Sequence, residues 1–216
     1  MCIHHTVRTW FRRGLLAAVA AVFSFGSLPS GAQGAPTPPQ QAPELAIAVC
    51  GTCHGVDGNS INPMFPRLAG QKAWYIKQQL KEFRAQTRGD PYAVAYMWGM
   101  ANQLSNATID ALANYFSRQT PGPGTPHSPA VIAQGRAIFE HGIPSQGVPA
   151  CAACHGPQGL GTSQFPRLAG QHAEYILKQL QSFQSNMRKV AIMHGVAQTL
   201  HKSQMKQVAD YLESLP

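Results

Sequence analysis

The chain has 216 residues, a length that fits one large domain or two small ones. Only 12% of the residues are charged, while glycine (20) and proline (17) are plentiful, so a pair of compact, loop-rich domains is favoured. Lysine and arginine outnumber aspartate and glutamate by 17 to 9, but they are scattered, which argues against a nucleic-acid partner or a polybasic membrane anchor.

The first 34 residues have the layout of a secretory signal peptide. Three arginines precede an apolar run from Leu15 to Phe25, and small residues follow. The run is shorter than the roughly 20 residues that a membrane-spanning helix needs. We expect cleavage after Gly34 and export to the periplasm, although an uncleaved signal would tether the protein to the membrane. Without the three arginines, 14 basic residues face 9 acidic ones, a net charge of +5.

The rest of the chain contains one pattern twice. The word FPRLAGQ occurs unchanged at 65–71 and 165–171, and each copy follows a Cys-x-x-Cys-His segment. Proline-rich stretches flank the copies. Residues 35–43 are expected to form a disordered leader, and residues 120–129 an extended linker. The sequence therefore predicts two tandem domains, at 44–119 and 130–216.

Each copy is expected to be helical. Apolar residues fall on one face over 71–87 and again over 171–185, and a proline start and a glycine stop mark a helix at 129–142. The last segment of each copy also has apolar residues at helical spacing. The residue at its N-cap position is Ser105 in the first copy and His201 in the second. Because histidine caps poorly, we expect the second of these helices to begin weakly. Strand-like alternation is absent, so the prediction is an all-α fold.

Two cysteine pairs, each followed by a histidine, carry the chemistry. Thiols at i and i+3 of a helical turn can add across the two vinyl groups of a haem, and the next residue offers an imidazole to the iron. Structural disulfides would not explain the histidines, a zinc site needs four ligands in one place, and a thioredoxin-like pair needs a βαβ setting. The sequence thus predicts two covalently bound c-type haems. The residues are Cys50, Cys53 and His54 in the first copy and Cys151, Cys154 and His155 in the second.

The duplication also selects the sixth ligand of each iron. Beyond a deletion of about four residues in the second copy, a constant offset pairs Met97 with Met193, and no other methionine after the signal peptide falls opposite a methionine. If both copies bind haem in the same way, these two residues are the ligands, with Met100 and His194 as local rivals.

In combination, CGTCHGVDGNS, the two copies of FPRLAGQ, MWGMANQL and IMHGVAQTL resemble the cytochrome c4 family, which has two class I cytochrome c domains in tandem. The resemblance implies a dihaem electron carrier of the bacterial periplasm, soluble or held loosely on the inner membrane. Such a carrier takes electrons from a quinol-oxidising branch and passes them to a terminal oxidase. The resemblance further implies that the two domains pack around a pseudo-twofold axis, with haem propionates near the interface.

The resemblance also assigns roles within FPRLAGQ. The proline carbonyl is expected to accept the second ring N–H of the haem-ligating histidine, which fixes the ring. The leucine is expected to pack on the haem, and the arginine either pairs with a propionate or is solvated at the surface. These residues are Pro66, Arg67 and Leu68 in the first copy and Pro166, Arg167 and Leu168 in the second.

One departure from the class I pattern concerns the first helix of each domain. That helix often carries a glycine and, four residues later, an aromatic residue for close crossing with the last helix. Gly135 and Phe139 supply this pair in the second domain, whereas Leu45 and Val49 stand at the corresponding positions in the first. The helix crossing of the first domain is therefore left open.

Two other functions share part of this pattern. An enzyme of the dihaem peroxidase type needs one iron open to peroxide, and the pairing of Met97 with Met193 argues against that. A cytochrome subunit docked in a larger oxidoreductase would share every motif. We expect an electron-transfer protein without catalytic residues, whose partners are redox proteins.

Overall fold

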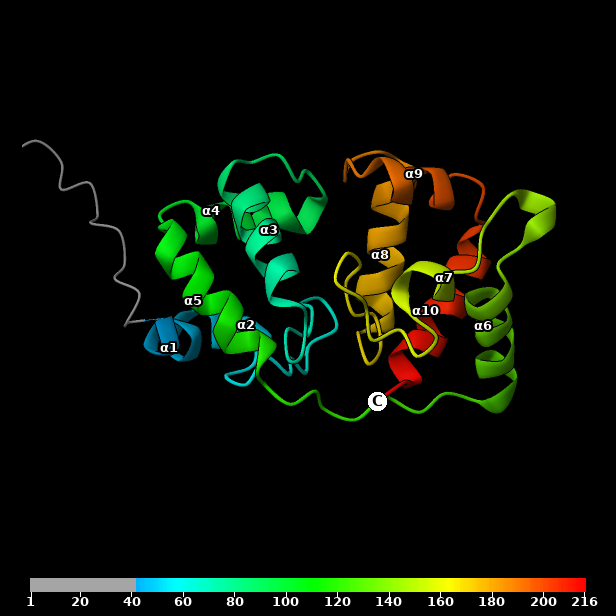
Figure 1. Cartoon of the computed structure of the whole chain (residues 1–216), viewed down its shortest axis with the longest axis horizontal. Helices are drawn as coiled ribbons and strands as arrows, with labels where there is room; N and C mark the ends of the chain where they lie inside the picture. The colour runs from blue at the N-terminus through cyan, green and yellow to red at the C-terminus, as the bar shows by residue number, and fades with distance from the viewer. Residues whose placement is uncertain (1–41) are drawn as a thin grey trace, which may run out of the picture. The chain divides into compact units, whose positions relative to one another are not determined.

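The computed structural model describes residues 42–216, so the expected signal peptide and nearly all of the leader lie outside the described residues. Within this part there are helices and loops, and the only β-type pairing is an isolated bridge between Ile143 and Val148. Figure 1 shows two groups of helices joined by the segment at 120–128, which has no regular structure. Over the same residues, no helix is long and apolar enough to cross a membrane. The all-α prediction is confirmed.

The first group of helices begins at Ala42 and ends at Ser117. Its core lies between α3 and α5, where Ile76 meets Leu112 and Phe116. The elements are α1 (Ala42–Leu45), the π-helical turn η2 (Ala46–Cys50), α2 (Gly51–His54), α3 (Ala73–Arg84), the π-helical turn η3 (Ala93–Met97), α4 (Trp98–Ala101) and α5 (Asn106–Ser117).

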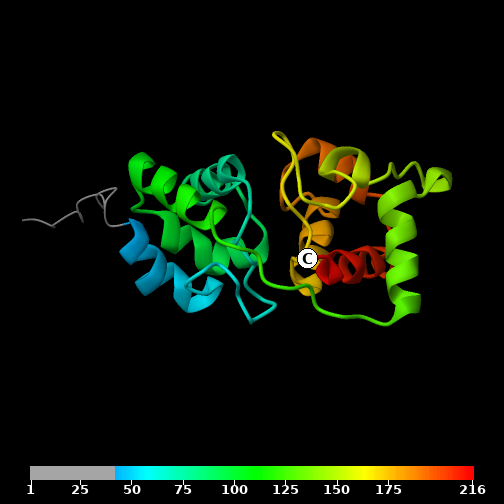
Figure 2. The ribbon, with the colours of Figure 1, turned by 60° about the horizontal axis from the view of Figure 1, so that its bottom comes forward.

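The second group repeats this arrangement. Its last helix packs against the helix at 129–141 and the helix at 173–184 (Figure 2). The side chains of Phe139, Met205 and Leu212 are buried in this core. The elements are α6 (Pro129–His141), the 3₁₀ turn η4 (Pro144–Gln146), α7 (Ala152–His155), α8 (Ala173–Gln184), α9 (Ala191–Ala197) and α10 (Lys202–Ser214).

The deletion before the methionine of the second copy corresponds to one helical turn. The methionine-bearing helices of the two domains end at equivalent alanines, Ala101 and Ala197, both 0% exposed. The first of these helices begins at Pro91, the second at Ala191, so residues 91–94 of the first copy have no counterpart. Four residues are about one turn of an α-helix. The insertion therefore lengthens the helix at its start and leaves its packed end unchanged.

The last helices of the two domains begin with different caps. The Ser105 side chain accepts a hydrogen bond from Thr108 N at 3.0 Å, as expected for an N-cap. At the start of the second helix, Gln204 compensates for the absence of a serine cap, because its Oε1 accepts a hydrogen bond from His201 N at 2.8 Å. The prediction from sequence that the helix after His201 begins weakly did not take this hydrogen bond into account.

Gly135 allows α6 to cross α10 closely. A Cβ added at this glycine would lie 2.1 Å from Gln207 O and 2.6 Å from Tyr211 Cβ, so any side chain would overlap the facing helix. One turn later, Phe139 is fully buried, with its ring centroid 5.5 Å from that of Tyr211. The glycine–aromatic pair thus lies at the crossing.

In the first domain, an alanine takes the place of the glycine at the corresponding helix crossing. Ala46, next to the expected position Leu45, is 0% exposed and packs against Leu112, Ala113 and Phe116 of α5. A methyl group is the smallest side chain after glycine, so alanine still permits a close approach.

We expect Gly135→Ala to lower the free energy of unfolding by about 1–3 kcal/mol, because the new methyl group overlaps the carbonyl of Gln207. Urea unfolding followed by circular dichroism measures this loss. The matched control is Gly195→Ala in α9, where an added Cβ meets nothing within 4 Å. Equal destabilisation by the two variants would show that α6 and α10 do not require the glycine.

Candidate haem sites and the interface between them

The two Cys-x-x-Cys-His segments fold as single helical turns, α2 and α7. Among the described residues, Cys50, Cys53, Cys151 and Cys154 form no disulfide, so all four are available for covalent attachment of haem. Cys50 and Cys151 pack against the apolar cores of their domains. Each turn therefore presents a dithiol and an imidazole beside an apolar core.

The histidines of these turns are buried and held by proline carbonyls. His54 and His155 are each 7% exposed. His54 Nδ1 lies 2.8 Å from Pro66 O, and His155 Nδ1 lies 2.9 Å from Pro166 O. A carbonyl oxygen only accepts, so Nδ1 carries the hydrogen and Nε2 keeps its lone pair for a metal. Burial lowers the pKa of both histidines, partly opposed by the bond to proline, which favours the neutral imidazole that iron requires.

Two methionines occupy matching positions beside the cores. Met97 packs against the cluster of Phe83, Ala93 and Ala101, and Met193 is partly buried against the core of the second domain. The two alternative residues, Met100 and His194, are less suited to be the sixth ligand. Met100 is 49% exposed, and the first copy has Trp98, not a histidine, at the position equivalent to His194. The geometry thus favours Met97 and Met193 as sixth ligands.

The surroundings of the histidines fit a haem group. Leu68 and Leu168 are partly buried against the two cores, as a residue covering a haem face would be. Arg67 Nε and Trp74 Nε1 are buried with no hydrogen-bond partner among the described residues, and such donors suit the propionates of a haem.

The phenylalanine that begins each FPRLAGQ word was not predicted to belong to the site. The Phe65 ring meets His54 edge-on with centroids 6.1 Å apart, and the Phe165 ring meets His155 at 5.8 Å. The sequence signal that could have indicated this role was the position of the phenylalanine, directly before the proline in a segment that is repeated unchanged. These contacts help to fix the plane of each imidazole.

The glutamine that ends each word joins the two domains. Gln71 Nε2 donates to Arg167 O at 2.9 Å, and Gln71 Oε1 accepts from Arg167 N at 2.9 Å. Gln171 makes the same pair of bonds to the backbone of Arg67, at 2.9 and 2.8 Å. The two FPRLAGQ segments therefore form reciprocal hydrogen bonds with each other. This is the approximate twofold symmetry that the family resemblance implied.

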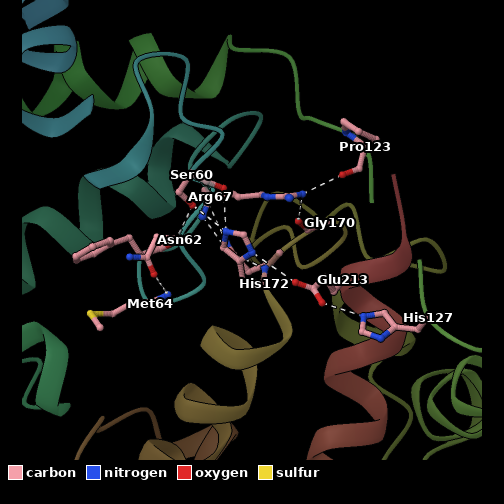
Figure 3. A network of polar contacts seen from close by, with 11 residues as sticks. Ser60, Asn62, Met64, Arg67, Pro123, His127, Gly170, His172 and Glu213 are labelled. Carbon is pink, nitrogen blue, oxygen red and sulfur yellow. Dashed lines mark hydrogen bonds and ion pairs between the residues drawn. The ribbon is translucent and has the colours of Figure 1, made fainter. Parts of the chain in front are cut away.

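The arginine side chains of the words also reach backbone carbonyls. Arg67 Nη1 donates to Pro123 O at 3.0 Å and to Gly170 O at 2.9 Å (Figure 3). Arg167 Nη2 donates to Pro216 O at 2.6 Å. Propionate pairing and surface solvation were the expected alternatives. These bonds connect Arg67 to the linker and to the second domain, and Arg167 to Pro216 of its own domain, while pairing with a propionate stays a prediction.

A second polar connection crosses the interface without a symmetric counterpart. His172 is 4% exposed, and its Nε2 lies 2.9 Å from Ser60 O of the first domain. Its Nδ1 lies 3.4 Å from Glu213 Oε1, and Glu213 Oε2 lies 2.9 Å from His127 Nε2 of the linker. Figure 3 shows this chain of contacts from the first domain through α10 to the linker.

Comparison with known proteins agrees with the geometry. The Cytochrome c family model matches the chain twice, at residues 40–119 and 132–216. Cytochrome c4 of Stutzerimonas stutzeri is 41% identical over 186 residues, which cover 81% of this chain and 88% of that protein. The crystal structure of reduced recombinant cytochrome c4 from Pseudomonas stutzeri aligns with a TM-score of 0.74 at 39% identity and covers 82% of this chain and 98% of that one.

The chain belongs to the cytochrome c4 family. Like these relatives, it is an electron-transfer cytochrome with two cytochrome c domains, and its two Cys-x-x-Cys-His turns carry two covalent c-type haems. Another relative of similar length, named thiosulfate dehydrogenase electron acceptor, from Thiomonas intermedia, is 36% identical over 208 residues, covering 92% of this chain and 91% of that protein. The name of this relative states its electron donor, thiosulfate dehydrogenase.

Proposed function

We propose that this member of the cytochrome c4 family is a periplasmic carrier that takes electrons from a quinol-oxidising branch and delivers them to a terminal oxidase. The observation that supports a carrier is the repeated site: each domain has a buried histidine fixed by a proline carbonyl and a methionine at a matching position. Histidine and methionine together fill both axial positions of a haem iron and raise its potential. This leaves no iron position open to a substrate.

The protein's own groups would act by holding each haem rigidly. The cysteine thiols would form the covalent attachment, His54 and His155 would ligate the iron through Nε2, and Met97 and Met193 would supply the second ligand. The bonds to Pro66 and Pro166 prevent the imidazoles from rotating. The haem supplies the one-electron couple. Fixed ligands keep the reorganisation between oxidation states small, which suits outer-sphere electron transfer.

The partners of such a carrier are redox proteins that dock at its surface. Two ionised propionates on each haem would offset most of the net charge of +5 expected for the exported chain, so docking would depend on local patches more than on net charge. We place the protein in the periplasm, free or loosely associated with the inner membrane.

Partner kinetics test the proposed route. We expect quinol-oxidising membranes to reduce the holoprotein completely, and oxidase-containing membranes to reoxidise it, in stopped-flow experiments read at the haem α-band. Inhibiting the quinol-oxidising complex should stop reduction. Reduction that continues unchanged under this inhibition would exclude the quinol branch as the donor.

A second candidate function is electron acceptor for thiosulfate dehydrogenase. The Thiomonas intermedia relative with that name matches this chain over nearly its whole length. The same stopped-flow experiment separates the two donors when purified thiosulfate dehydrogenase with thiosulfate replaces the membranes. Fast reduction there, with slow reduction by quinol-oxidising membranes, would favour this second function.

A further inference from the structure

His172 lies at the start of α8 and is buried against the first domain. It is 4% exposed, and its Nε2 lies 2.9 Å from Ser60 O and 3.0 Å from Ser60 Oγ. A carbonyl oxygen only accepts, so Nε2 carries a hydrogen and donates it to Ser60. Ser60 is itself 2% exposed, so water does not compete for this contact. A side chain of the second domain thus holds a buried serine of the first.

Ser60 in turn holds the loop that leads into the first FPRLAGQ segment. Its hydroxyl donates to Phe65 O at 2.7 Å, and since a hydroxyl has one hydrogen, its oxygen is left to accept from His172. Phe65 O belongs to the planar peptide bond of Pro66, whose φ is fixed by its ring. A held Phe65 carbonyl therefore limits where Pro66 O can lie, and Pro66 O is the atom that accepts from His54 Nδ1 at 2.8 Å.

The other side of the His172 ring faces Glu213 of α10. Nδ1 lies 3.4 Å from Glu213 Oε1, and Glu213 Oε2 lies 2.9 Å from His127 Nε2 of the linker (Figure 3). Glu213 is only 9% exposed, so this carboxylate is part of the packed interior. The ring is therefore enclosed from both sides, and its position depends on the second domain and the linker.

In the second domain, the carbonyl before the proline is held by different atoms. Phe165 O accepts from the backbone N–H of Thr162 at 2.8 Å, and Thr162 Oγ1 accepts from Phe165 N at 3.1 Å. Both bonds stay within the second domain. Phe65 O, by contrast, depends on the side chain of Ser60, which is bound by the other domain.

The first domain also lacks an equivalent of His172. The matching residue is Lys72. The backbone N–H of each bonds to Oε1 of the preceding glutamine, at 3.1 Å for His172 and 2.9 Å for Lys72, so the backbones correspond. Among the described residues, the Lys72 side chain makes no hydrogen bond or ion pair. The glutamine bonds to Arg67 and Arg167 act on both domains alike, whereas the path through His172 acts on the first domain alone.

We propose that His172 is a positioning residue for the haem site of the other domain, because through Ser60 and Phe65 it keeps the Pro66 carbonyl against His54. The bond at Nδ1 fixes the plane of the imidazole and raises the basicity of Nε2, the atom that faces iron. The axial histidine of the first domain therefore responds to the docking of the second domain by a path that has no reverse counterpart. The inference requires His54 to ligate haem iron, but it does not depend on which proteins donate or accept the electrons.

NMR of the holoprotein tests this role, because the haem methyl resonances of oxidised haem depend on the plane of the axial imidazole. Ser60→Ala removes the donor to Phe65 O, and His172→Ala removes the donor to Ser60. We expect both variants to shift the methyl resonances of the first-domain haem and to leave those of the second-domain haem in place. In the reduced protein, the His54 Nδ1 hydrogen should exchange about fivefold faster, as for one weakened hydrogen bond, while the His155 Nδ1 hydrogen keeps its rate.

His172→Gln is the conservative variant. Its side-chain amide can still donate to Ser60, so the first-domain resonances should return towards their positions in the unmodified protein. Lys72→Ala is the matched control, since it changes the equivalent residue of the first domain. We expect it to move the resonances of neither haem.

If His172→Ala fails to fold, His172→Phe takes its place, because it keeps a ring of similar size without the donor. First-domain resonances that stay unchanged in the folded His172 variants would overturn the inference. Resonances of both haems that move together would also overturn it, since that result indicates a general loosening of the interface. The spectra are recorded without a partner, so failure of the proposed electron route would leave this result intact.

Discussion

Met97→Ala is expected to open the first-domain haem to carbon monoxide while both haems stay attached. The substitution removes the sixth ligand and leaves Cys50, Cys53 and His54 in place, so iron gains a vacant position without loss of the covalent bonds. The ferrous variant should bind one equivalent of carbon monoxide per chain, against none for the unmodified protein. Its oxidised form should keep about half of the weak absorption near 695 nm that reports a methionine–iron bond.

Met100→Ala is the control for this experiment. Met100 lies three residues later on the same helix and is 49% exposed, so its loss should change neither carbon monoxide binding nor the 695 nm band. Carbon monoxide binding by Met100→Ala in place of Met97→Ala would transfer the ligand role to Met100. A 695 nm band from only one haem in the unmodified protein would show that the two sites are ligated differently, as the peroxidase alternative requires.

The double variant Gln71→Ala, Gln171→Ala is expected to loosen the contact between the two domains. Each substitution leaves a backbone N–H and a backbone carbonyl of the facing arginine without their partner. An unsatisfied buried polar group costs about 1–3 kcal/mol, so four such groups represent a loss of several kcal/mol, reduced wherever water replaces the glutamine. Urea unfolding of the holoprotein should show this loss, and hydrogen exchange should become faster at the Arg67 and Arg167 amides.

Gln78→Ala is the matched control for the double variant. Gln78 lies on α3, and its amide bonds to Glu82 Oε1 at an exposed site within the same helix. We expect a change of less than about 0.5 kcal/mol and normal exchange at Arg67 and Arg167. If the double variant matched this control in both measurements, the crossed glutamine bonds would contribute nothing to domain association.

The all-α duplicated fold and the residues around each iron were accessible from sequence because they depend on local spacing. The Cys-x-x-Cys-His turn carries its chemistry within five residues, and the repeat shows which methionines correspond. The structure places the Pro66 and Pro166 carbonyls beside His54 and His155, as the resemblance implied. Their ligand roles remain predictions that the methionine variants address.

The interface was not accessible in the same way, because its partners lie about a hundred residues apart. Nothing in the local environment of Gln71 indicates that it binds the backbone of Arg167, and a repeated word is explained equally well by the haem alone. Arg88 and Arg188, which are 5% and 4% exposed, do align when the 100-residue offset between the two FPRLAGQ segments is continued up to the deletion, so the sequence indicated that their positions are equivalent. Their burial depends on how the two domains pack, which spacing does not reveal.

The crossed bonds between the FPRLAGQ words have a consequence for how such a molecule can arise. Each word contains both the glutamine that reaches across and the arginine backbone that it reaches, so a single repeat carries both sides of an isologous contact. Two separate copies would need only concentration to associate through it. The linker at 120–128 holds both domains in one chain and so gives each a high effective concentration near the other. Covalent joining also lets the halves diverge independently, and the first half now has residues 91–94, which the second lacks.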